Sequence, residues 1–170
     1  GPKLTYPIYY DGTIGQAKRH LTKTAEKINE KYSDIKAYIS VNKALVTQAS
    51  AAIPIVPLYF AILYKVMKKA GNHENCIQQI ARLFTQKLYT PTGFQTDENG
   101  FIRMDDYELT PEIQEEVKKC WKAVTTDTVK EYCDIDGYWE DFYHMFGFRY
   151  EDIDYTQDVD ADIEIDGVVM

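Results

Sequence analysis

The sequence predicts an α/β fold that is rich in helix and lacks its first strands and its glycine-rich turn. A long helix is expected over residues 14–31, and a short β-favouring run, IKAYISVN, follows it at residues 35–42. A helix followed by a strand is the order found in an αβ unit. Neither GxGxxG nor GxxxxGKS/T occurs in the 170 residues, and most of the remaining chain has helical periodicity. Because one strand cannot form a sheet, we expect a chain that begins mid-protein, as the second half of a larger α/β protein.

The predicted first helix begins with a capping signal. Thr13 is expected as its N-cap, and Gln16 follows three residues later, which completes the capping box TIGQ. Apolar residues then recur at helical spacing as far as Lys31. The helix should therefore start at about Ile14.

Two further helices are predicted in the middle of the chain. The first begins with Pro57, ends at Gly71, and is apolar nearly all round from Leu58 to Leu63, so it should be buried. The segment 72–89 is expected to form an amphipathic helix. Its apolar stripe would consist of Ile77, Ile80, Ala81 and Phe84.

The C-terminal part of the chain predicts a hairpin followed by helices. Asn99-Gly100 lies between two short extended pieces in FQTDENGFIRMD (94–105), which is a hairpin signal. Thr110 and the proline after it predict a capped helix over 110–124. Shorter helices are expected over 125–133 and 137–147. We expect one structural unit over 1–155 and an acidic tail over 156–170.

Charge, cysteine content and hydropathy limit the function classes. The net charge is −8, and residues 141–170 carry nine acids and one base, so residues 1–140 are neutral overall. Nucleic-acid binding, which needs clustered Lys and Arg, is therefore not expected. Three widely spaced cysteines indicate a reducing compartment, and we expect a cytoplasmic protein. The most apolar run, 49–64, is short and contains two prolines, so no integral membrane segment is expected.

Tyr9 and Lys18 are the first candidate site residues. On one continuous helix, nine residues would place them on opposite faces. They converge only if Tyr9 precedes the helix and the chain turns between them, and Gly12 with the Thr13 cap supplies such a turn. A phenol so placed would donate a proton to a substrate carbonyl oxygen, and a nearby ammonium would orient a cofactor ribose. From spacing alone, a packed tyrosine and a surface lysine are the commoner arrangement.

The segment after the predicted strand is the second candidate site. Ligands of open α/β sheets bind outside the carboxyl ends of strands. Here Thr47 and Ser50 offer hydroxyls and Lys43 offers a charge, which suit phosphate or nicotinamide-amide contacts. The alternative is a loop whose hydroxyls cap a helix, and the residues alone leave both open.

No metal site is expected. His73 and Cys76 in HENC are two possible ligands, but no CxxC motif or second histidine lies nearby. DVDADIEID (158–166) resembles a calcium loop in its first positions only. Position six is Ile163 rather than glycine, and position twelve is Val169 rather than glutamate.

Five collinear segments resemble the C-terminal part of the trans-2-enoyl-CoA reductases, the family that includes the FabV-type enoyl-ACP reductases. They are IYYDGTIGQAKRHL, SVNKALVTQASAAIPIVPLYFAILYKVMK, GNHENCIQQIARLF, IRMDDYEL and GFRYEDIDY, and they cover the chain to about Tyr155. The resemblance implies a Rossmann-type reductase fold. The family signature is a tyrosine and a lysine separated by eight residues, and it falls on Tyr9 and Lys18. This implies Tyr9 as the catalytic proton donor, Lys18 as a cofactor contact, and further dinucleotide contacts at Leu45, Val46 and Thr47.

The implied reaction is the NADH-dependent reduction of the trans-2,3 double bond of an enoyl-CoA or enoyl-ACP. Hydride goes to the β-carbon, the thioester oxygen becomes an enolate, and Tyr9 stabilises or protonates it. The apolar run IPIVPLYFAILY (53–64) would help to wall the acyl site. Family members are longer and carry the glycine-rich NAD turn in an N-terminal half. That half is therefore an implied partner, and the chain alone is expected to be inactive.

Two other interpretations stay open. One is a non-catalytic helical fragment or interaction module. The other is a different dehydrogenase that reuses a Tyr/Lys pair. In short-chain dehydrogenases the pair is four residues apart on one helical face, which does not match the spacing of nine in this chain.

Overall fold

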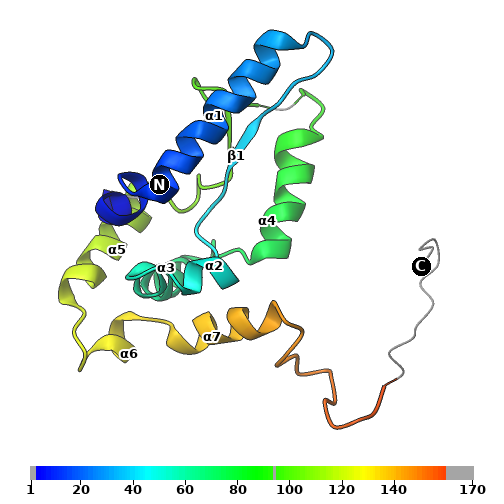
Figure 1. Ribbon diagram of the computed structural model, residues 1–170. Helices are drawn as coiled ribbons and strands as arrows, with labels where there is room; N and C mark the ends of the chain where they lie inside the picture. Colours follow the sequence, from blue (N-terminus) through cyan, green and yellow to red (C-terminus); the bar gives the residue numbers. More distant parts are fainter. Residues whose placement is uncertain (1–2, 94, 160–170) are drawn as a thin grey trace.

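The computed structural model describes residues 3–93 and 95–159, and their elements are mostly helical (Figure 1). In chain order they are η1 (Lys3–Thr5, 3-10), η2 (Tyr6–Tyr10, π), α1 (Thr13–Lys31), β1 (Ile39–Val41), α2 (Gln48–Ala51), α3 (Val56–Ala70), α4 (Cys76–Arg82), η3 (Leu83–Leu88, π), β2 (Phe101–Arg103), α5 (Pro111–Ala123), α6 (Val129–Tyr132) and α7 (Ile135–His144). No helix among the described residues is long and apolar enough to span a bilayer.

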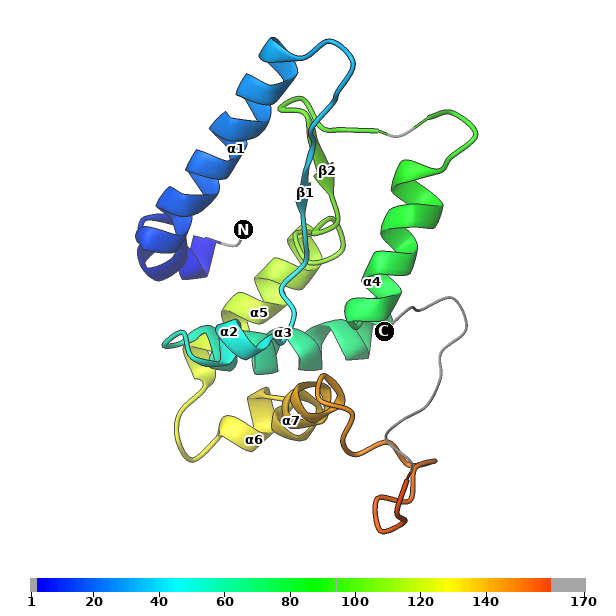
Figure 2. The same cartoon turned by 45° about the vertical axis from the view of Figure 1, so that its right-hand side comes forward.

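The two described strands form a parallel pair, as an α/β fold requires. Ile39 of β1 lies opposite Phe101 of β2, and Val41 lies opposite Arg103. Figures 1 and 2 show α1 and α4 on either side of the strands, with α1 running in the opposite direction to β1. The N-terminal end of α1 and the carboxyl end of β1 therefore lie toward the same end of the molecule.

The predicted hairpin at residues 94–105 is wrong, although its turn is correct. Gly100 adopts a positive φ of 78°, and its N–H donates to the Asp97 carbonyl over 3.0 Å. The Asp97 carboxylate accepts the backbone N–H groups of Asn99 and Phe101, at 2.9 and 3.0 Å. The Asp97 N–H also donates to the Phe101 carbonyl over 2.8 Å, so the turn closes locally. No strand directly precedes this turn among the described residues, and β2 pairs with β1, which lies far away in the sequence.

The core is built around α3, as its apolar composition predicts. Pro57 lies in the first turn, and Gly71 ends the helix in the left-handed conformation with a φ of 73°. Five side chains of this helix are at most 1% exposed: Tyr59, Ile62, Leu63, Tyr64 and Met67. Helix α3 packs against α5 and α7, and both views show α6 and α7 beneath it (Figures 1 and 2).

The N-cap predicted for α1 is wrong. Gly12, with extended backbone, is the N-cap, and Thr13 is the first helical residue. No side-chain hydrogen bond caps this end, so the expected capping box does not form. Instead, the backbone of η2 packs directly against the first residues of α1.

The predicted apolar stripe of residues 72–89 is exposed on the surface rather than packed against the core. Ile77 is 74% exposed and Ile80 48%, whereas Arg82 is only 6% exposed. The Arg82 guanidinium donates to Glu74 over 2.6 and 2.9 Å and to the Met104 carbonyl over 2.8 Å. These charge-assisted bonds turn the polar face of α4 inward. The helix then continues as the π-helix η3 rather than as a regular α-helix.

His73 follows α3 and is kept neutral by its surroundings. Its ring packs edge-on against Tyr64, with 4.3 Å between ring centroids. Burial, together with the charges of Lys43 and Lys68, lowers the pKa of His73 to about 4. At pH 7 the 3.9 Å between His73 Nε2 and the Asp141 carboxylate is therefore not an ion pair.

Acidification from pH 6.5 to pH 4 should destabilise the chain through His73. Over this range the unfolded state binds a proton that the folded state rejects, so the contribution of His73 to stability falls as the pH falls. His73→Phe keeps a ring against Tyr64 and removes the titration. Unfolding free energies are measured in urea for both proteins. The value for the variant minus the value for the original protein should increase by up to about 3 kcal/mol as the pH falls from 6.5 to 4.

Two buried carboxyls increase the stability as the pH falls, but both the original protein and the His73→Phe variant contain them. Burial raises the pKa of Glu108 and of Asp141. The difference between the two stability curves therefore isolates His73. Parallel curves for His73→Phe and the original protein would show that His73 does not titrate with a lowered pKa.

The predicted acidic tail lies mostly outside the described residues. Residues 156–159 are exposed, and the calcium-like sequence from position 160 onward is outside the described part of the chain. The boundary at Tyr155 stays a prediction.

Candidate active site

The structure brings Tyr9 and Lys18 together. Tyr9 lies on the π-helix η2, before α1, and Lys18 projects from the second turn of α1. The Lys18 Nζ atom is 5.8 Å from the centroid of the Tyr9 ring, at the outer limit of a cation–π contact. Single-turn π segments are frequent at functional sites. The predicted convergence of the pair is therefore observed.

The close approach of η2 and α1 depends on two glycines that lack a Cβ atom. A Cβ on Gly15 would lie 1.8 Å from the Tyr10 carbonyl oxygen, and one on Gly12 would lie 2.5 Å from the Ile8 carbonyl oxygen. Gly12 has a φ of −84°, which other residues adopt readily. Gly12 therefore provides space for a neighbouring backbone rather than the conformational freedom that its place in the predicted turn suggests.

Arg19 of α1 also holds η2 in place, through Tyr10. Its Nη1 atom donates to the Tyr10 carbonyl over 3.0 Å, and its guanidinium carbon lies 5.2 Å from the centroid of the Tyr10 ring. The ring of Tyr10 also stacks on Tyr6, with 4.8 Å between centroids. Neither Gly15 nor Arg19 was identified from the sequence. Their spacing of four, which places them on one face of α1, is the signal that could have identified them.

Lys18 keeps its charge accessible. The side chain is exposed, and none of the ion pairs within residues 3–93 and 95–159 includes it. Its ammonium can therefore contact a ligand beside the Tyr9 hydroxyl.

The segment after β1 differs from the prediction at Lys43. This residue is 2% exposed, so it offers no surface charge. Burial lowers its pKa to about 8, against an opposing effect of Glu108. Thr47 and Ser50 cap each other: the Thr47 hydroxyl accepts from the Ser50 amide over 3.1 Å, and the Ser50 hydroxyl accepts from the Thr47 amide over 2.8 Å. The interpretation of these hydroxyls as helix caps is correct.

The segment at residues 44–47 and the start of the chain pack against one hydrophobic cluster. Leu4, which precedes Tyr9, packs against the same hydrophobic cluster as Ala44 and Val46. In that segment Val46 is 5% exposed, Leu45 is half-buried and Thr47 is exposed. The two predicted groups of site residues are thus joined through one core.

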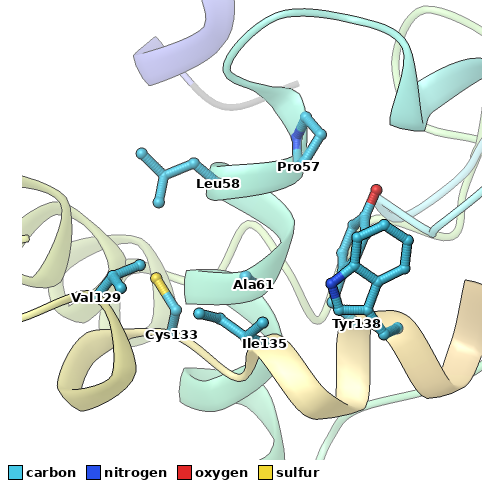
Figure 3. Close-up of a pocket in the computed structure, with 8 residues that line it drawn as sticks. Pro57, Leu58, Ala61, Val129, Cys133, Ile135 and Tyr138 are labelled. Atoms are coloured by element: carbon cyan, nitrogen blue, oxygen red, sulfur yellow. The ribbon is translucent and has the colours of Figure 1, made fainter. Parts of the chain in front are cut away.

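An apolar cavity of about 200 Å³ opens between α3, α6 and α7 (Figure 3). Helix α3 contributes Pro57, Leu58 and Ala61, and the facing elements contribute Val129, Cys133, Ile135, Tyr138 and Trp139. The first turns of α3 belong to the apolar run that was expected to wall an acyl site. Its apolar lining suits an aliphatic chain.

Two family models match the chain. "Trans-2-enoyl-CoA reductase catalytic region" matches residues 1–89, and "Enoyl reductase FAD binding domain" matches residues 96–159. The first match contains Tyr9, Lys18 and the segment 45–47. More than half of the chain therefore follows the catalytic-region model.

The residues matched by the second model do not fit a flavin dinucleotide. Residues 96–159 contain 18 acidic and 6 basic side chains, a net charge of −12, which opposes an anionic pyrophosphate. Arg103 in this segment is already paired with Asp105 and Asp97, at 2.7 and 3.2 Å. The described part of the segment thus offers no basis for a flavin-dependent step.

Curated relatives and solved structures agree with the first model. The chain is 47% identical to an enoyl-[acyl-carrier-protein] reductase [NADH] of Flavobacterium psychrophilum and 49% identical to a trans-2-enoyl-CoA reductase [NADH] of Ruminiclostridium cellulolyticum. Each match covers 99% of this chain and 43% of the relative, so the chain spans less than half the length of the relatives it matches.

The fold matches experimental structures at a similar level. The trans-2-enoyl-CoA reductase of Clostridium acetobutulicum in complex with NADH matches with a TM-score of 0.89 and 48% identity, over 94% of this chain and 41% of that structure. The Treponema denticola enzyme in complex with NAD matches with a TM-score of 0.88 and 46% identity, over 94% and 40%. The helix-rich chain with its parallel strand pair is thus part of a Rossmann-type reductase fold, and it belongs to the trans-2-enoyl-CoA reductase family.

Proposed function

We propose that this chain supplies the proton-donating part of an NADH-dependent enoyl-thioester reductase. The observation that carries the proposal is the Tyr9–Lys18 pair, held together by a turn that only glycines at positions 12 and 15 permit. Membership of the trans-2-enoyl-CoA reductase family supports it. The substrate is a trans-2-enoyl thioester, carried by coenzyme A or by acyl carrier protein, since the relatives bear both names.

Tyr9 and Lys18 act on the thioester oxygen in this mechanism. NADH, when bound, supplies the hydride that the β-carbon of the substrate accepts. The Tyr9 hydroxyl donates a hydrogen bond or a proton to the thioester oxygen as that oxygen gains enolate charge. The ammonium of Lys18 lies on the same side of the turn, where it stabilises the developing charge and contacts the cofactor.

The chain fits part of a nicotinamide dinucleotide. Lys18 is exposed outside the described ion pairs, and the Leu45 amide N–H has no hydrogen-bond partner among the described residues. Both are suitable donors to a ribose or an amide. No glycine-rich loop for the pyrophosphate occurs in the 170 residues, so the remaining contacts come from sequence outside this chain.

The reaction is tested with the full-length enzyme that contains this chain. With crotonyl-CoA and NADH deuterated at the transferred position, butyryl-CoA should form with one deuterium on the β-carbon, as measured by mass spectrometry. NADH oxidation without saturated product, or no reaction with either a CoA or a carrier-protein substrate, would contradict the proposal. A non-catalytic module would give that second result.

A further inference from the structure

Two buried side chains hold the segment that follows β1 by its backbone. The Ala44 N–H donates to Glu108 Oε2 over 2.7 Å, and the Val46 N–H donates to the Tyr64 hydroxyl over 3.0 Å. Glu108 is 2% exposed and Tyr64 is fully buried. Alternate amides of the segment are thus tied to the core, and the Leu45 amide between them remains without a partner among the described residues.

Glu108 is itself fixed by neighbours on α3 and α5. The Tyr59 hydroxyl donates to Glu108 Oε1 over 2.7 Å, and Gln114 donates to the Glu108 carbonyl over 2.8 Å. Lys43 donates to the Ala44 carbonyl over 3.0 Å and balances the charge of Glu108 from within the same core.

Tyr64 is held in place in a similar way, by a residue of α7. Its hydroxyl interacts with the carboxylate of Asp141, and its ring lies 5.2 Å from the Lys43 ammonium and packs against His73. Both hydroxyl-bearing side chains, Tyr59 and Tyr64, come from α3, the helix around which the core is built.

Burying charged groups such as Glu108 and Lys43 costs free energy, and stability of the fold alone does not require it. A buried carboxylate and a buried ammonium lose hydration, and apolar residues of similar volume often stabilise a core better. Here the buried groups converge on the backbone of two alternate residues, Ala44 and Val46. A site placed on a loop needs such support to keep its geometry.

We propose that Glu108 and Tyr64 are positioning residues for the dinucleotide, which they serve by fixing the backbone of the segment 45–47 against α3. This inference rests on the proposed function, which gives the segment its ligand. Neither residue touches the cofactor. They act through the Ala44 and Val46 amides.

The test compares two tyrosines of the same core in the full-length enzyme. Tyr64→Phe removes the hydroxyl that accepts the Val46 amide and keeps the ring. Tyr107→Phe is the matched control, because it removes a tyrosine hydroxyl from the same core cluster, keeps its ring against Arg82, and leaves both contacts to the segment in place. Tyr64→Phe should raise the KM for NADH and the Kd from NADH fluorescence titration about tenfold, with kcat within about threefold. Tyr107→Phe should change each by less than about twofold.

Glu108 gives a second, independent comparison. Glu108→Gln keeps an oxygen acceptor for the Ala44 amide and should retain NADH affinity within about threefold. Glu108→Leu keeps similar volume, loses the acceptor and should weaken NADH binding about tenfold or more. Melting temperatures of all four variants report any general loosening of the fold.

Three outcomes would overturn the inference. They are an unchanged Kd in Tyr64→Phe, equal losses in Tyr107→Phe and Tyr64→Phe, and a Glu108→Gln variant as weak as Glu108→Leu. A different result addresses the proposed function: if the unsubstituted full-length enzyme does not bind NADH, the reductase assignment itself fails.

Discussion

Replacing Tyr9 by phenylalanine in the full-length enzyme should lower kcat on the order of 100-fold or more. The substitution keeps the ring near Lys18 and removes only the hydroxyl that we propose as the donor to the developing enolate. Substrate binding depends little on that hydroxyl, so kcat should fall much more than the KM for crotonyl-CoA changes. Steady-state oxidation of NADH with crotonyl-CoA measures both constants.

Tyr10→Phe is the matched control for this experiment. Tyr10 is the next residue of η2, and its ring stacks on Tyr6 rather than lying near Lys18. Its variant should retain kcat within about threefold. A Tyr9→Phe enzyme that turns over at the full rate would remove Tyr9 from the mechanism.

Gly15→Ala should lower kcat/KM on the order of 100-fold, although Gly15 carries no reactive group. The added Cβ would lie 1.8 Å from the Tyr10 carbonyl oxygen and close to two further backbone atoms of that residue. Backbone atoms cannot rotate away as a flexible side chain does, so η2 must move off the first turn of α1. Tyr9 moves with it, and the pair with Lys18 is lost.

Ala17→Ser, on an exposed position of the same helix, serves as the control for added volume and should leave kcat/KM nearly unchanged. The melting temperature should separate displacement of η2 from global unfolding. If Gly15→Ala keeps the original kcat/KM, the tight packing of η2 on α1 does not determine the position of Tyr9.

Local signals in the sequence predicted the parts of the fold that depend on local chemistry. Pro57 and Gly71 mark the ends of α3, and the apolar run between them is the core. The Asn99-Gly100 turn and the Thr110 cap of α5 are likewise present. Each of these features involves residues a few positions apart, so the sequence alone contains the information.

The errors arise where a distant residue decides the outcome. The amphipathic helix predicted over 72–89 has its apolar stripe exposed, because Arg82 is buried and bonds to the Glu74 carboxylate and to the Met104 carbonyl beside β2. Lys43 is expected to offer its charge to a ligand, but it is buried in a segment whose Ala44 amide bonds to Glu108, 64 residues further along the chain. The second strand was assigned to a hairpin because its true partner, β1, is remote. No spacing rule within one segment reveals these pairings.

Two kinds of reasoning led to the candidate site. Geometry showed that Tyr9 and Lys18 converge only across a turn, and the structure has that turn. The chemistry assigned to the pair came from the family resemblance, since spacing alone favours a packed tyrosine and a surface lysine. The spacing of four places Gly15 and Arg19 on one face of α1, but only the structure shows that the Tyr10 carbonyl lies against that face.

Oxidation of NADH with crotonyl-CoA, measured side by side for this 170-residue chain and for the full-length enzyme that contains it, tests the central claim most directly. The claim is that the chain carries the proton donor without most of the binding site for the hydride donor. The full-length enzyme should turn over and the chain alone should show no measurable oxidation. Turnover by the chain alone would contradict the claim and require a complete cofactor site within these residues, and an inactive full-length enzyme would contradict the assignment as a reductase.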